Sequence, residues 1–444
     1  MVAPVPVGAV PVPPAVVGRQ QLAQRGEQVV VAPRAGLDDG HPRGRVRHPH
    51  VEQSRVGAAR AQERVDLGGQ VTHGLRRSGA DLDQFAVHAA DPTARAGSVG
   101  PVRTAFGETF DVPDGYLNTA SVGVPPVRVT EAVLESVRRW GSGGYSPPEF
   151  DAPVATARAA FAALVGVAPA QVAIGPAVSV LLGPIAAAVP DGASVVVARG
   201  EFTSVSFPFA VQQGRGVRVT EVEPDRLVER AADADVVAVS VVQSGDGRIA
   251  DLDGLRAVRQ RHGTRVVLDV TQAAGWLPLS LGWADVVVGG GYKWLLSPRG
   301  TAWMAVRPGS DAAEAVPHLA GWYASEQPWG GIYGLPPLLA ADARRFDTSP
   351  AWTCQVGAAE VLPWLAGLDV AAVHAHCAGL ADALRAALGM PPAGSAIVSV
   401  AAPDAIDRLT AAGVRAAARA GGARLAFHLY NTGDDLDRAI DALT

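Results

Sequence analysis

From about residue 116 onward, short apolar runs alternate with alanine-rich segments. Four runs are of strand length and rich in valine, at residues 194–198, 236–240, 265–269 and 285–289. Residues 154–165 and 252–262 instead repeat their apolar positions at helical spacing. Strands without polar alternation are buried on both faces. The pattern predicts an α/β fold with a mostly parallel central sheet and helices on both faces.

The carboxyl-terminal quarter predicts a second, smaller α/β unit, with helices near residues 355–365 and 370–388. We therefore expect a large domain over residues 102–350, including an N-terminal arm at 102–130, and a small domain over 351–444.

Residues 1–101 have a different composition. The first hundred residues contain twelve Arg, five His and one aromatic residue, Phe85. Such a stretch cannot bury enough apolar surface to offset its ordering entropy, so we expect disorder. Two explanations stay open, a genuine flexible extension and a start assigned too far upstream. We favour the second, because valine at position 102 can be specified by an alternative start codon.

Charge and cysteine content narrow the functional classes. The formal net charge is −5, which gives no reason to expect nucleic acid or an anionic membrane surface as a partner. The two cysteines, Cys354 and Cys377, form no disulfide framework, so a reduced, cytoplasmic setting is expected. Both are interpreted as buried small apolar residues. No apolar run is long enough to predict a transmembrane helix, and no metal site is expected.

Lys293 is the only lysine in the 444-residue chain; the other 37 of the 38 Lys and Arg residues are arginine. It lies in the sequence GGGYKW, at the end of the apolar run 285–289. Arginine cannot replace an amine nucleophile, because a guanidinium stays protonated and forms no Schiff base. The alternative is that Lys293 is a surface lysine that has been retained by chance. The residues around Lys293 favour a functional amine.

Asp269 closes the run 265–269, and Lys293 follows 24 residues later after one further strand. Ligands of parallel sheets bind beyond the carboxyl ends of the strands, so both residues are expected to open into one cleft. A carboxylate there can keep a pyridinium nitrogen protonated, which makes the ring an electron sink. Gln272 can donate to a phenolic oxygen on that ring. A helix-capping role is the alternative for Asp269.

Three further segments follow strand ends. The turn at residues 175–179 precedes a predicted helix at 180–188, and free N–H groups at a helix start suit a phosphate. Phe202 can lie against an aromatic ring of a ligand; the alternative interpretation is an ordinary phenylalanine of the hydrophobic core. Ser244 follows the strand at 236–242 and can reach the same cleft.

In their order and spacing these residues resemble the class V aminotransferase family of pyridoxal-phosphate enzymes, which has the fold type I architecture. The family includes cysteine desulfurases, kynureninases and isopenicillin-N-epimerase-like proteins. The resemblance extends from about residue 116 to 443. Its segments are YLNTA at 116–120, GPAVS at 175–179, EF at 201–202, DVTQ at 269–272, GYKWLL at 291–296, RRFD at 344–347 and RLAFHLYNT at 424–432.

The resemblance implies roles for individual residues. Lys293 would be the Schiff-base lysine and proton shuttle, and Asp269 the partner of the ring nitrogen. Phe202 stands where relatives often stack a histidine. Gly290 stands where many relatives use a serine phosphate ligand, so the phosphate would depend on backbone amides. The implied cofactor-binding residues are Ala177, Val178, Ser179, Phe202, Ser244, Asp269, Gln272, Tyr292 and Lys293.

Arg424 and Asn118 would bind the substrate, with Arg424 pairing the α-carboxylate. A salt bridge at the edge of the small domain is the alternative for Arg424. The resemblance also implies a homodimer and pyridoxal 5'-phosphate as cofactor. We expect an enzyme that acts at the α-carbon of an amino acid through an external aldimine, with an aminotransferase favoured. A C–S or C–N lyase, an epimerase and a non-catalytic binding protein stay open.

Two other classes are disfavoured. Desulfurase relatives carry a nucleophilic cysteine on a loop between two arginines that match Arg419 and Arg424. Only the four residues 420–423 separate these arginines here, and none is cysteine. A nucleotide-binding Rossmann protein would need a Gly-x-Gly-x-x-Gly turn after its first strand, and residues 173–179 do not supply it.

Overall fold

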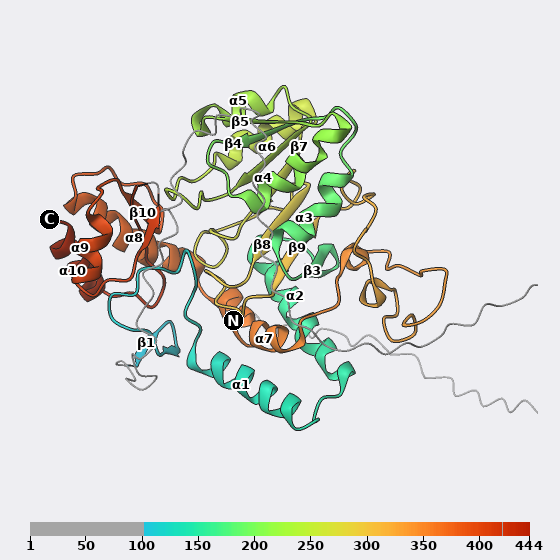
Figure 1. Cartoon of the computed structure of the whole chain (residues 1–444), viewed down its shortest axis with the longest axis horizontal. Coiled ribbons are helices and arrows are strands. Elements are labelled where there is room, and N and C mark those ends of the chain that lie inside the picture. Colours follow the sequence, from blue (N-terminus) through green and yellow to red (C-terminus); the bar gives the residue numbers. More distant parts are fainter. Residues whose placement is uncertain (1–101, 420) are drawn as a thin grey trace, which may run out of the picture. The chain divides into compact units, whose positions relative to one another are not determined.

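A seven-stranded sheet forms the centre of the computed structural model, which describes residues 102–419 and 421–444 (Figure 1). The four strand pairs from β8 to β5 are parallel, whereas β9 is antiparallel to both of its neighbours. The predicted mostly parallel α/β sheet is thus confirmed. In spatial order the strands are β3 (Val172–Gly175), β9 (Ala302–Val306), β8 (Val286–Gly290), β7 (Arg265–Asp269), β6 (Val236–Ser240), β4 (Ser194–Ala198) and β5 (Arg218–Val222).

Helices cover both faces of this sheet, as continuous apolar strands require. On β7, Val266 and Leu268 belong to one hydrophobic core and Val267 to another, because successive side chains point to opposite faces. One core is shared with α3 (Val178–Ala187) and α4 (Thr203–Ala210). The other is shared with α1 (Val127–Gly141), α2 (Asp151–Val165), α5 (Leu227–Ala231), α6 (Leu252–His262) and α7 (Trp352–Gly367).

Local sequence sets the ends of the helices. Asp251 caps α6 by accepting a hydrogen bond of 2.8 Å from the backbone N–H of Gly254. Gly263 ends the same helix with φ of 74°, a left-handed conformation that favours glycine. These signals explain why the predicted and observed spans of this helix coincide.

A third hydrophobic core lies in the carboxyl-terminal part of the chain. A three-stranded antiparallel sheet of order β10 (Ile397–Val400), β12 (Gly422–Ala426) and β11 (Ala417–Arg419) packs with α8 (Val370–Ala387), α9 (Ala405–Ala411) and α10 (Gly433–Leu443). The buried side chains of α7 instead belong to the core of the large sheet. We keep the division into domains at residue 350 as a proposal.

The expected N-terminal arm contains a short hairpin of β1 (Arg103–Ala105) and β2 (Glu108–Phe110). Arg103 anchors it to α10 through an ion pair of 2.6 Å with the buried Asp435. Our expectation for residues 1–101 lies outside the described residues. No single helix in the described part has the length and apolar character to cross a membrane; only α7 and α8 taken together, at 94° to each other, pass by length and composition.

A buried ion pair ties α2 to β3. The Arg158 guanidinium lies 2.7 Å from the Asp347 carboxylate, which also accepts a hydrogen bond of 2.8 Å from the backbone N–H of Ile174. Arg158 donates in addition to the carbonyl of Val172. These contacts fix β3, and therefore the turn that leads into α3.

Replacing Asp347 with asparagine should lower the free energy of unfolding by about 3–5 kcal/mol, because the buried Arg158 loses its counter-charge. Urea unfolding measures the change. Asp311→Asn is the matched control: Asp311 pairs with Arg265, but its side chain is 87% exposed, so the loss should stay within about 1 kcal/mol. Equal losses in the two variants would contradict a structural role for the buried pair.

Candidate active site

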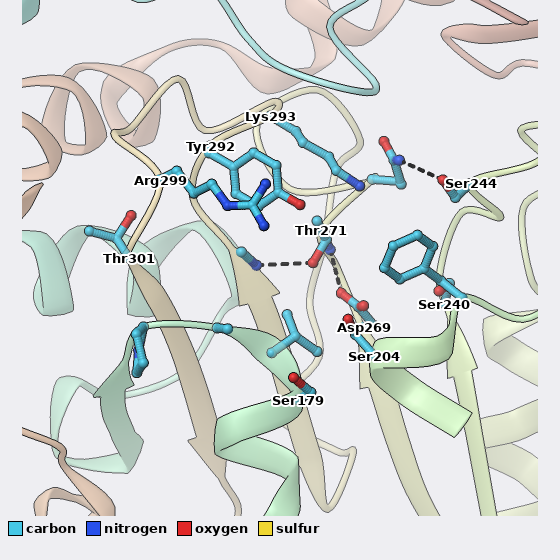
Figure 2. A pocket seen from close by; sticks show the side chains of 16 residues that line it. Ser179, Ser204, Ser240, Ser244, Asp269, Thr271, Tyr292, Lys293, Arg299 and Thr301 are labelled. Atoms are coloured by element: carbon cyan, nitrogen blue, oxygen red, sulfur yellow. Dashed lines mark hydrogen bonds between the residues drawn. The ribbon is translucent and has the colours of Figure 1, made fainter. Parts of the chain in front are cut away.

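A cavity opens at the edge of the large sheet where the parallel strands end (Figure 2). The empty space inside it, open mouth included, is about 730 Å³. The ends of β6, β7 and β8, the loops after these strands and the starts of α3 and α4 supply its walls. The lining residues are Pro176, Ala177, Val178, Ser179, Phe202, Ser204, Ser240, Ser244, Asp269, Thr271, Gln272, Gly290, Tyr292, Lys293, Arg299 and Thr301.

Lys293 lies in the loop between β8 and β9 and is only 6% exposed. Its ammonium nitrogen is 5.2 Å from the centre of the Phe202 ring. Backbone packing holds the loop: Gly123 donates to the carbonyl of Tyr292 at 3.0 Å, and any Cβ at position 123 would collide with the carbonyl of Lys293. Burial lowers the pKa of Lys293 to about 8, against the opposing effect of Asp269. The amine therefore loses its proton far more readily than an exposed lysine.

Asp269 lies at the end of β7 and is 4% exposed. One carboxylate oxygen accepts a hydrogen bond of 2.7 Å from the backbone N–H of Thr271 (Figure 2). Burial raises the pKa of Asp269 to about 6, while the hydrogen bonds from Thr271 and the charge of Lys293 oppose the rise. The carboxylate is mostly ionised at neutral pH, as a partner for a ring cation must be.

Arg424 is 1% exposed and lies next to the cavity. Its guanidinium donates to the Ser244 carbonyl at 2.6 Å, to the Ser244 hydroxyl at 3.0 Å and to the Ser121 hydroxyl at 2.7 Å. Burial and the neighbouring Arg419 lower the pKa of Arg424 to about 10. Within residues 102–419 and 421–444 no carboxylate pairs with Arg424, and its Nε has no partner. The alternative of an edge salt bridge finds no support there, and a buried cation of this kind suits an anionic ligand.

Gln272 is held by three groups rather than left free. Its side-chain nitrogen donates to the Ala120 carbonyl at 3.0 Å and to the Ser244 hydroxyl at 3.1 Å. Its oxygen accepts from the indole of Trp294 at 2.7 Å. Both amide hydrogens are thus engaged, and Ser244 links Gln272 to Arg424. The role of Gln272 as a donor to the cofactor stays a prediction.

Phe202 is positioned by Glu201, a buried carboxylate that our sequence analysis did not single out as a site residue. Glu201 accepts hydrogen bonds from the backbone N–H of Phe202 at 2.8 Å and from that of Ser240 at 2.8 Å, and also from the Gln243 side chain at 2.9 Å. The network joins the ends of β4 and β6. Its sequence signal is an acidic residue just after a buried strand.

The start of α3 forms another wall. The helix begins at Val178, so the expected start at residue 180 was two residues late. Ala177 is its N-cap in extended conformation and makes no side-chain capping bond. Ser179 is therefore in the first turn, where backbone N–H groups have no partner within the helix. This end of the cavity can receive an anion.

All nine predicted cofactor-binding residues line the cavity. Asn118 does not; it forms a parallel bridge with Ala426, and its buried side-chain oxygen has no partner among the described residues. Sequence reasoning missed five polar lining residues, Ser204, Ser240, Thr271, Arg299 and Thr301. The expectation that both cysteines are buried is wrong for Cys354, which is only partly buried because it lies on the first turn of α7.

The fold together with a buried lysine and a facing carboxylate at the sheet edge defines a pyridoxal-phosphate enzyme of fold type I. The aminotransferase class-V family model matches residues 149–405, and the chain belongs to that family. An uncharacterised aminotransferase of Bacillus subtilis, YcbU, is 30% identical over 65% of this chain and 82% of its own length. A kynureninase of Deinococcus radiodurans is 28% identical over 59% of this chain and 66% of its own.

Solved structures share the fold. The apo cysteine desulfurase of Thermococcus onnurineus NA1 superimposes with a TM-score of 0.64 at 18% identity, over 74% of this chain and 94% of that one. The cystine C–S lyase C-DES with its product cysteine persulfide gives 0.63 at 19% identity, over 74% and 96%. A C-DES variant with glycine covalently linked to the pyridoxal-phosphate cofactor gives 0.63 at 20% identity, with the same coverage.

The cofactor is pyridoxal phosphate, as membership of the class V aminotransferase family establishes. The residues present here fit it. The cavity offers a buried amine for an aldehyde, a buried carboxylate for a ring nitrogen and a helix start for a phosphate. Arg424, with its unpartnered Nε, offers a place for a substrate anion.

Because Lys293 is the only lysine, its titration can be followed directly. The rate at which an amine-specific reagent modifies the apoprotein at this residue should rise with a midpoint near pH 8. Asp269→Asn should move the midpoint lower, because the carboxylate stabilises the ammonium form. Asp311→Asn is the control and should leave it unchanged. A midpoint near that of an exposed lysine would show that the amine is solvated.

Proposed function

We propose that this chain is an aminotransferase that acts at the α-carbon of an amino acid, with Lys293 as its Schiff-base and proton-transfer residue. One observation carries the proposal: the only amine side chain of the protein is buried with a lowered pKa, in the same cavity as the buried Asp269. A lysine kept for surface charge would be exposed.

Bound pyridoxal phosphate supplies an aldehyde that reacts with amines and a ring that accepts electrons from the substrate's α-carbon. The neutral amine is the reactive form of Lys293. With a pKa of about 8, roughly a tenth of the amine is neutral at pH 7, against less than about a thousandth for an ordinary lysine. The same nitrogen would take the proton from the substrate's α-carbon.

Asp269 is proposed to hold the proton on the ring nitrogen. Its ionised carboxylate is fixed by the backbone N–H of Thr271 and shielded from water, so its charge acts through a low dielectric. Phe202 contributes a ring face but no titratable group. Proton transfer at the α-carbon therefore falls to Lys293 alone among these three residues.

Arg424 and Asn118 are proposed to bind the substrate, Arg424 through its α-carboxylate. The guanidinium is oriented in advance by Ser244 and Ser121, so little side-chain entropy is lost on binding. A planar fork that meets a carboxylate also orients the α-carbon. Ser244 lines the cavity as well, which links substrate and cofactor positions.

Two observations support an aminotransferase over a persulfide-forming desulfurase. The relative that is 30% identical is described as an aminotransferase. Neither cysteine is suited to attack: Cys377 is fully buried, and burial raises the pKa of Cys354, whose thiol donates to the Arg299 carbonyl at 3.3 Å. A C–S or C–N lyase that needs no cysteine is the second candidate, since a kynureninase is also among the relatives.

We further propose a homodimer in the cytoplasm. The segment 316–338 exposes several large apolar side chains that a second copy would cover. They are Val316, Leu319, Trp329, Ile332, Tyr333, Leu335 and Leu338. Both cysteines are free, which is compatible with a reducing compartment.

Single-turnover reactions of the holoenzyme with individual amino acids test the reaction class. A transaminase should release one keto acid per site and then stop, with the amino group retained on the cofactor, until a keto acid acceptor is added. Continuous release of keto acid with ammonia or sulfide and no acceptor would instead identify a lyase. Absence of any spectral change with all amino acids would point to a binding protein.

Arg424→Gln should lower kcat/KM by about ten- to a hundredfold, mainly through KM, because a charge-assisted pair with the substrate is lost. The apoprotein should lose little stability, since removal of a buried cation without a carboxylate partner offsets the lost hydrogen bonds to Ser244 and Ser121. Steady-state kinetics and urea unfolding together measure both effects. The exposed Arg226→Gln serves as control. A loss of stability with unchanged KM would assign Arg424 a structural role.

A further inference from the structure

Two positions at the phosphate end of the cavity lack side-chain donors. Ala177 caps α3 without a hydroxyl, and Gly290 ends β8 without a side chain. A Cβ at position 290 would meet its nearest atoms, on Thr271 and Tyr292, at 3.6 Å, which is ordinary contact. Space for a hydroxyl side chain therefore exists there, but the chain does not use it.

The remaining hydroxyls are partly engaged. Thr271 accepts a hydrogen bond of 2.9 Å from the backbone N–H of Gly290 (Figure 2), and Thr301 donates to the Pro298 carbonyl at 2.9 Å. Ser179, Ser204, Tyr292 and the first turn of α3 are further uncharged donors on the cavity wall. A helix start carries only about half an elementary charge, whereas a phosphate monoester carries up to two. These groups therefore neutralise only a small part of the phosphate charge.

Arg299 supplies a full positive charge to the cavity wall beside Tyr292. It lines the cavity from the loop between β8 and β9, and its guanidinium carbon is 5.0 Å from the centre of the Tyr292 ring (Figure 2). Across the described ranges, no hydrogen bond or ion pair engages its guanidinium. Its charge also lowers the pKa of Lys293, as do those of Arg424 and Arg419.

The backbone around Arg299 is held in place. Its carbonyl accepts a hydrogen bond from the Cys354 thiol at 3.3 Å. The next residue, Gly300, has φ of 111°, and a Cβ there would lie 3.2 Å from the Cys354 sulfur. A side chain that stacks on Tyr292 from a fixed backbone loses little freedom when it binds a ligand.

We propose that Arg299 binds the phosphate group of pyridoxal phosphate and takes the place of the side-chain donors that Ala177 and Gly290 lack. A planar guanidinium can donate two parallel hydrogen bonds to phosphate oxygens, and its charge offsets the part that the helix start does not. The proposal rests on the cofactor site proposed at Lys293. It concerns affinity for the phosphate and leaves the chemistry at the amine unchanged.

Comparing pyridoxal phosphate with pyridoxal, which lacks the phosphate, isolates this contribution. Apoprotein prepared from the holoenzyme is titrated with each aldehyde, and the visible absorbance of the bound form gives both dissociation constants. Arg299→Met should raise the dissociation constant of pyridoxal phosphate by about tenfold or more. It should leave the dissociation constant of pyridoxal within about twofold of the wild-type value. Arg299→Lys should fall between wild type and Arg299→Met, because it keeps the charge but not the fork.

Gly290→Ser combined with Arg299→Met tests the replacement directly. A Cβ at position 290 has room beside Thr271 and Tyr292, and the serine hydroxyl should recover part of the lost affinity for pyridoxal phosphate without changing that for pyridoxal. The control is Arg226→Met, an exposed arginine paired with Glu229, which should change neither constant.

If Arg299→Met bound both aldehydes more weakly by the same factor, the proposal would be overturned, because the residue would then act on the fold or the amine. Unchanged affinity for pyridoxal phosphate would overturn it as well. Failure of the underlying site is distinguishable: if Lys293 did not hold the cofactor, Lys293→Ala would retain the visible absorbance with pyridoxal phosphate, whatever residue stood at position 299.

Discussion

Burial of one amine beside one carboxylate at the edge of a parallel sheet is the constraint on which the site depends. Burial lowers the pKa of Lys293 and raises that of Asp269, so both groups change protonation state closer to neutral pH than they do in water. The sheet makes this possible because neighbouring parallel strands end at one edge. Asp269 ends β7 and Lys293 follows β8, its neighbour.

Positive charge exceeds negative charge around this pair. Arg299, Arg419 and Arg424 all lower the pKa of Lys293, whereas Asp269 raises it. Repulsion between these positive charges destabilises the apoprotein, and bound anions relieve that repulsion. The phosphate of the cofactor and the carboxylate of an amino acid together supply the missing charge, which connects cofactor binding and substrate binding through one local field.

Elements defined by local sequence signals were predicted correctly. The strands at residues 194–198 and 265–269 and the helix at 252–262 have the predicted bounds, since valine-rich runs and an Asp cap define them. The family and the cofactor are confirmed as well. The strand β5 was missed because it lies at the sheet edge and carries exposed polar residues.

Tertiary contacts explain what could not be predicted. Glu201 becomes a positioning residue only because β4 and β6 are neighbours in space. Arg299 is one arginine among 37, and nothing in its local sequence distinguishes it from a surface charge. Arg158 and Asp347 lie 189 residues apart, so their pairing has no sequence signature.

The role of Lys293 is tested most directly by locating the bond between protein and cofactor. Borohydride reduction of the holoenzyme fixes a lysine-bound aldehyde as a stable amine, and digestion followed by mass spectrometry finds the modified peptide. If Lys293 holds the cofactor, the peptide that contains Lys293, and no other, will carry the mass of the reduced cofactor. Modification of the N-terminal amine alone, or no modification of a protein that retains its visible absorbance, would contradict this role of Lys293.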